Sequence, residues 1–134
     1  MIILDAAVVI AYLEGSDDAH HAAAVAVVDA HIGDETLGVS ALNLAELLVR
    51  PVRRGNSEHA LNLVLGNLDV TIVPILGSDA LRLAEIRAST GLKLPDCCVL
   101  LAAERTGAGA IVTFDDRLRD AARGHGLIVL PQKT

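Results

Sequence analysis

Four acidic residues of this chain are candidates for catalysis or metal binding. Two of them closely follow predicted strands, and the other two lie in predicted helices. The four are Asp5, Glu46, Asp96 and Asp115. Carboxylates gathered in one place repel one another unless protons or cations neutralise them. A ligand set made of oxygen atoms suits Mg2+ or Mn2+, whereas zinc normally draws histidine or cysteine. A divalent ion held in this way can activate water and stabilise charge on a phosphate under in-line attack.

The apolar pattern around these acids predicts short buried strands that alternate with helices. Strands are expected at 2–4, 36–39, 70–73, 110–113 and 128–130, and helices at 6–14, 19–30, 41–49, 57–65, 95–105 and 116–123, with one more between a Ser78 cap and Thr90. Ser40 is expected to cap the helix at 41–49, and Pro51 is expected to follow its end. Every link between strands is long enough for a helical crossover, and the strands lack polar alternation. The sequence therefore predicts an α/β fold with a parallel sheet of four to five strands.

The predicted elements bring the four acids to one edge of this sheet. Ligands of open parallel sheets bind where the strands end and the helices begin. Asp5 lies one residue past the first strand, and Asp115 lies two residues past Thr113, the last residue of the fourth. Asp96 lies at the start of a helix, and Glu46 can reach the edge from about a turn and a half into its own helix.

Each acid also has a purely structural explanation. The three at helix starts can accept hydrogen bonds from free N–H groups and favour the helix dipole. Glu46 precedes Arg50 by four residues, which is the spacing of an ordinary helical ion pair. Asn43, Glu46 and Arg50 form a thin polar stripe whose apolar neighbours leave little room for a solvated face, so the stripe needs a partner. Singly, each acid is better explained by these roles; together they favour a site.

Composition limits the possible classes of protein. The 134 residues form one domain, residues 1–134, and the 52% apolar content excludes disorder. A net charge of −6 argues against a general nucleic-acid coat protein. Tyr12 and Phe114 are the only aromatic residues, which nearly excludes stacking of bases on aromatic platforms.

The same sequence indicates a cytoplasmic protein. Its longest apolar run, Ala6 to Leu13, has eight residues and is too short to span a bilayer. The N-terminus has no basic segment, and Asp5 interrupts any signal-like run. Cys97 and Cys98 are adjacent in an apolar stretch, which predicts two buried, reduced thiols.

Four strings of residues, in this order along the chain, resemble the motifs of the PIN-domain family. Ile3-Leu4-Asp5 resembles the family's opening, Ser40 to Leu47 its glutamate helix, Leu94-Pro95-Asp96 its third acidic motif, and Val112 to Leu118 its fourth. Order, spacing and length are similar to those of the VapC type, the toxin half of bacterial toxin–antitoxin pairs. The resemblance covers essentially the whole chain.

This resemblance implies a three-layer α/β/α fold and an endoribonuclease that hydrolyses RNA phosphodiesters with metal-activated water. Asp5 and Asp96 would be the most direct ligands of Mg2+ or Mn2+. Glu46 and Asp115 would complete the cluster, directly or through water, or orient the attacking water. Thr113 matches a hydroxyl position that could support the site. The resemblance also implies a homodimer and a VapB-like antitoxin whose tail occludes the site.

The chain departs from the family pattern in two places. Many relatives carry serine or threonine two residues after the first aspartate, where this chain has Ala7. The pair Asp115-Asp116 leaves the fourth acid ambiguous by one residue, and spacing to Thr113 favours Asp115.

Two other classes of protein compete with a nuclease. A receiver-like phosphoacceptor should carry an acidic pair after its first strand, where Asp5 stands alone. A catalytically silent PIN-fold module that binds RNA or an antitoxin would have no need of all four acids. The five histidines show no spacing typical of metal ligands and are expected at solvated positions. The basic residues Arg50, Arg53 and Arg54 are expected in a solvated turn, from which they could contact RNA phosphates.

Overall fold

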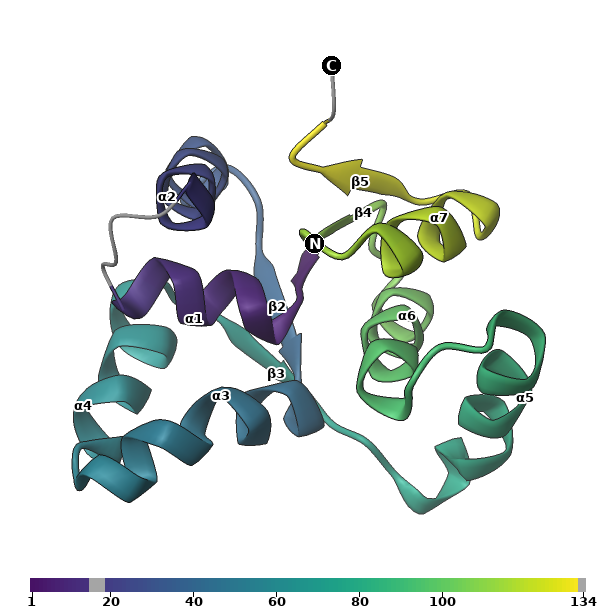
Figure 1. Ribbon diagram of the computed structural model, residues 1–134, viewed down its shortest axis with the longest axis horizontal. Helices are drawn as coiled ribbons and strands as arrows, with labels where there is room; N and C mark the ends of the chain where they lie inside the picture. The colour runs from purple at the N-terminus through teal and green to yellow at the C-terminus, as the bar shows by residue number, and fades with distance from the viewer. Residues whose placement is uncertain (15–18, 133–134) are drawn as a thin grey trace.

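A sheet of five parallel strands forms the centre of the computed structural model, which describes residues 1–14 and 19–132 (Figure 1). The strands are β1 (Ile2–Leu4), β2 (Leu37–Ser40), β3 (Thr71–Val73), β4 (Ala110–Val112) and β5 (Ile128–Leu130), in the order β3-β2-β1-β4-β5. All neighbouring strands run parallel. The predicted α/β class and parallel sheet are therefore confirmed.

Helices cover both faces of the sheet. They are α1 (Ala6–Glu14), α2 (Ala19–His31), α3 (Ala41–Arg54), α4 (Ser57–Leu61), α5 (Ala80–Thr90), α6 (Leu94–Thr106) and α7 (Asp116–Gly124). Core residues of α1, α2 and α3 pack with Ile2 and Leu4 of β1. Those of α5, α6 and α7 pack with Ile3, whose side chain points to the opposite face. Figure 1 shows α1 to α4 to the left of the sheet and α5 to α7 to its right.

Three predicted helix boundaries are wrong. Helix α3 continues through Pro51 to Arg54, because proline's fixed φ is compatible with a helix; Gly55, at φ 75°, ends it. The helix expected at 57–65 becomes π-helical over Asn62–Asn67. Ser78 does not cap α5: it lies in a 3₁₀ turn, Gly77–Asp79, in which the Asp79 carboxylate accepts a hydrogen bond from the Leu76 N–H at 2.7 Å.

The other local predictions agree with the structure, except that some strand and helix ends shift by one residue. Ser40 caps α3 by accepting a hydrogen bond from the Asn43 N–H, and Gly107, at φ 67°, follows the last residue of α6. Cys97 and Cys98 are buried free thiols. Among residues 1–14 and 19–132, no helix is long and apolar enough to cross a membrane.

Candidate active site

Asp5 lies at the centre of the sheet's carboxyl edge and is only 8% exposed. Its N–H donates to the Val112 carbonyl, which fixes the end of β1 against β4. Thr113 Oγ1 donates to Asp5 Oδ2 at 2.9 Å. Burial first, and the charges of Asp96 and Glu46 in addition, raise the pKa of the Asp5 carboxyl to about 6 against the effect of this hydrogen bond. A carboxylate in this position is poised to receive a cation or a proton.

Asp96 lies in the first turn of α6 and is partly buried beside the same edge. Burial, followed by the negative charges of Asp115 and Glu46, raises the pKa of its carboxyl above the ordinary value. Lys93 and Arg117 are near enough to oppose that rise. Asp96 therefore interacts electrostatically with two other carboxylates and with two cations.

Asp115 is exposed at the end of the β4 segment and does cap α7, since its Oδ1 accepts a hydrogen bond from the Leu118 N–H at 3.0 Å. Its own N–H donates to Thr113 Oγ1 at 3.1 Å. The Thr113 hydroxyl therefore accepts from the Asp115 backbone and donates to Asp5, which ties two of the four acids together. Asp115 therefore both caps α7 and belongs to the acid group. Asp116 is the first residue of α7.

Glu46 is exposed, contrary to the expectation that its helix leaves little room for a solvated face. Arg50, its predicted partner, instead forms an ion pair with Glu14 of α1 at 2.7 Å. Glu46 Oε1 accepts a hydrogen bond from Asn43 Nδ2 at 3.0 Å, and its charge acts on Asp5 and Asp96. Arg50 and Glu46 thus have different partners: Arg50 binds Glu14 of α1, whereas Glu46 binds Asn43 and acts on the other acids.

The four acids are gathered, but they do not form a tight cage. Each acts electrostatically on at least one other member of the group. Among the residues that the structure describes, no three His, Cys, Asp or Glu side chains converge closely enough to hold a metal ion. The donor set consists of four carboxylates, and burial together with neighbouring negative charges raises the pKa at Asp5 and Asp96. Oxygen donors of this kind fit a hard divalent cation.

Asn43 is the site residue whose role the sequence did not reveal. It is 1% exposed, and its Oδ1 accepts a hydrogen bond from the Ser40 hydroxyl. Its Nδ2 donates both to Glu46 and to the Pro95 carbonyl, at 3.0 and 3.1 Å. Asn43 thereby fixes Glu46 and links the end of β2 to the turn that carries Asp96. The polar stripe pointed to Asn43, but the contact with Pro95 spans 52 residues.

If the acids bind a divalent ion, Asn43→Leu should raise the Mn2+ concentration needed for half-maximal stabilisation of the fold about tenfold, because Glu46 and the Pro95 turn lose their shared donor. Melting curves over a range of Mn2+ concentrations measure this. Val64→Ala, a truncation in the buried core of the π-helical segment, is the control for destabilisation alone. If both variants require the same metal concentration as the wild type, Asn43 has only a structural role.

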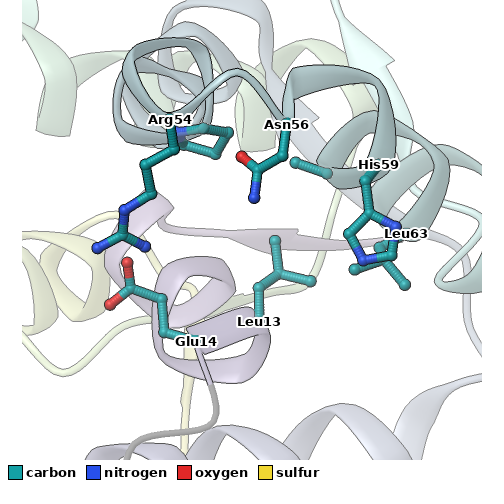
Figure 2. Close-up of a pocket in the computed structure, with 8 residues that line it drawn as sticks. Leu13, Glu14, Arg54, Asn56, His59 and Leu63 are labelled. Carbon is teal, nitrogen blue, oxygen red and sulfur yellow. The ribbon is translucent and has the colours of Figure 1, made fainter.

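A cavity of about 430 Å³ lies between the end of α1 and the α3–α4 region. Figure 2 shows the carboxylate of Glu14 and the guanidinium of Arg54 facing each other at one end of it, with His59 at the other end. A second hollow of about 250 Å³ shares Glu14 with this cavity and extends to Glu46 and Arg53. The prediction that Arg50, Arg53 and Arg54 lie in a turn is wrong, because α3 continues through them to Arg54. Arg54 lines the first cavity, whereas Arg50 and Arg53 line the second hollow beside Glu46.

The histidines agree only partly with their predicted solvated positions. His20 is exposed, yet its ring stacks on Phe114 with centroids 4.7 Å apart. Phe114 lies between Thr113 and Asp115, so this ring pair borders the acid group.

The chain belongs to the PIN-domain family, since a model of that family matches residues 2–124. Its structure is similar to VapC20 of Mycobacterium tuberculosis, a sarcin–ricin loop cleaving toxin, with a TM-score of 0.72 and 16% identity over 90% of this chain and 95% of that one. A toxin–antitoxin complex from Klebsiella pneumoniae gives a TM-score of 0.74 and 18% identity over 100% of both chains. FitAcB from Neisseria gonorrhoeae gives 0.71 and 21% identity over 96% of both. Comparison with curated protein sequences gives no match.

Proposed function

We propose that this protein is a VapC-type toxin, an endoribonuclease that hydrolyses RNA phosphodiesters with Mg2+ or Mn2+. The observation that carries this proposal is the group of four carboxyls at the carboxyl edge of a PIN-domain sheet, with a buried Asp5 whose pKa is raised to about 6. A carboxylate that is buried beside other carboxylates costs stability, and such perturbed groups cluster at functional sites.

Asp5 and Asp96 are the residues that we expect to hold the ion, because they are the two buried or partly buried members of the group. A bound divalent ion supplies a nucleophilic water and neutralises charge on the attacked phosphate. Glu46, fixed by Asn43, accepts a proton from the attacking water or orients it. Thr113 keeps Asp5 in place, a task that a hydroxyl at position 7 could share in relatives.

We further propose a VapB-like antitoxin as partner, a homodimer as the free form and the cytoplasm as the place of action. Two structural neighbours are toxin–antitoxin complexes, one from Klebsiella pneumoniae and VapBC2 from Rickettsia felis. A tail carrying a basic side chain would complement the negative charges of Asp5, Asp96, Asp115 and Glu46 at the edge of the sheet. Exposed apolar side chains such as Val52, at 62%, and Leu81, at 72%, offer surface for association.

We predict that the products of cleavage carry a 5′-phosphate and a free 3′-hydroxyl, since a metal-held water does not need the RNA's own 2′-hydroxyl. A substrate with one 2′-deoxy sugar at the cut site should still be cleaved. Mass spectrometry of the fragments identifies the ends, and EDTA should stop the reaction.

Cyclic or 3′-terminal phosphates formed in the presence of EDTA would contradict the metal mechanism. RNA binding without any cleavage, at every metal concentration, would instead favour the catalytically silent module.

A further inference from the structure

A cleft of about 570 Å³ lies between the end of α5 and helix α7, beside the acid group but outside it. Its walls include Thr90 and Leu92 from one side and Arg117, Asp120 and His125 from the other. The volume is within the range of pockets that hold small ligands. Figure 1 shows the two helices on the same side of the sheet, flanking α6.

Arg117 connects this cleft to the acids. Its guanidinium lines the cleft, and its positive charge also acts on Asp96. Nη2 donates to the Gly91 carbonyl at 3.3 Å, an uncharged acceptor that does not neutralise the guanidinium. Three other arginines of the described chain, Arg50, Arg82 and Arg105, are instead engaged in ion pairs with carboxylates.

The interior of the cleft can contact a base as well as a phosphate. His125 Nδ1 lies 2.8 Å from the Ala121 carbonyl, so in the neutral ring Nδ1 donates and Nε2 is left as an acceptor. The exposed Asp120 adds a second acceptor, and Leu92 and Ala121 supply apolar surface. Acceptors of this kind suit the amino groups of nucleobases.

We propose that this cleft binds a nucleotide of the RNA next to the cleaved bond, with a phosphate on Arg117 and its base between α5 and α7. The proposal rests on the proposed ribonuclease function. Lys93, which also acts on Asp96, adds a second cation near the acids. In a chain of net charge −6, these cations give a polyanion a favourable approach to one side of the acid group.

The test is binding of a fluorescently labelled single-stranded RNA of about 12 nucleotides, measured by anisotropy in Mg2+ over a range of salt concentrations. All proteins carry Asp5→Asn, so that the RNA stays intact. Arg117→Gln should weaken binding about tenfold and lower the slope of log Kd against log salt by about 0.7. Arg123→Gln, an exposed arginine of α7 that does not line the cleft, is the matched control and should change Kd less than about twofold.

A second variant tests the cleft by filling it. Gly124 lines the cleft, and a Cβ built there has no atom within 4 Å, so Gly124→Leu adds bulk without a clash. We expect about fivefold weaker binding with an unchanged salt slope, because no charge is lost. Gly66→Leu, equally free of contacts but outside the cleft, should bind as the unsubstituted protein does.

Equal losses from Arg117→Gln and Arg123→Gln, or no loss from either, overturn the proposal, as does unchanged binding by Gly124→Leu. Cleavage by the protein with native Asp5 separates this failure from that of the proposed function. If that protein cleaves RNA and Arg117→Gln leaves KM unchanged, the cleft is wrong and the function stands. If it does not cleave while Arg117-dependent binding persists, the function is wrong and the cleft stands.

Discussion

Asp5→Asn is expected to lower RNA cleavage by several orders of magnitude while making the folded protein more stable at neutral pH. The loss follows because the substitution removes a proposed direct ligand of the metal. The gain follows because the pKa of the buried Asp5 carboxyl is raised from 3.8 to about 6, so its ionised form costs the folded state up to about 3 kcal/mol above pH 6. Asparagine keeps an acceptor for the Thr113 hydroxyl.

The gain in stability from Asp5→Asn depends on pH. The unfolded chain releases the Asp5 proton near pH 4 and the folded chain near pH 6, so the free energy of unfolding falls as pH rises between them. Urea unfolding in EDTA should show Asp5→Asn and the wild type equally stable below about pH 4 and diverging up to about pH 6. Asp34→Asn, at an exposed position, is the control. Wild-type activity in Asp5→Asn would contradict the proposed role of Asp5 as a metal ligand.

Millimolar Mg2+ or Mn2+ is expected to raise the melting temperature of the wild type, and to do so much less in Asp96→Asn. A ligand that binds only the folded state at about 100 times its Kd adds about 2.7 kcal/mol to the free energy of unfolding. For a chain of this length that corresponds to a shift on the order of 10 °C. Part of the gain comes from relief of the repulsion that Asp115 and Glu46 exert on Asp96.

The comparison needs KCl at matched ionic strength, because salt alone screens repulsion between carboxylates. A melting curve that responds equally to KCl and to the divalent ions would count against a formed metal site. A full response retained in Asp96→Asn would place the binding elsewhere in the protein.

The architecture could be predicted from the sequence because its signals are local. Short aliphatic runs separated by helical lengths define a parallel sheet, and glycines such as Gly107 mark helix ends by their left-handed backbone. The predicted end of α3 at residue 49 is wrong, because Pro51 lies within the helix rather than after it. The structure accommodates Pro51 in the last turn of α3, and Gly55 ends the helix. The π-helical turn at Asn62–Asn67 has no local signal of its own.

The site could be predicted as far as strand ends fix positions. Asp5 and Thr113 were expected at the same edge, and their hydrogen bond bears this out. The contact between Asn43 and Pro95 could not be foreseen, since it depends on how closely α3 approaches α6. The same holds for the ion pair of Arg50 with Glu14, in which a partner from another helix replaced the one four residues away.

The hydrogen bond between Thr113 and Asp5 joins residues that are 108 positions apart in the sequence. A ribosome synthesises Asp5 well before Thr113. During synthesis, the nascent chain therefore lacks the group that fixes its central carboxylate until the segment after β4 has emerged. For a protein proposed to cut RNA, this order of assembly keeps the acid group incomplete while the intervening residues are made, which gives the proposed antitoxin time to meet the nascent chain.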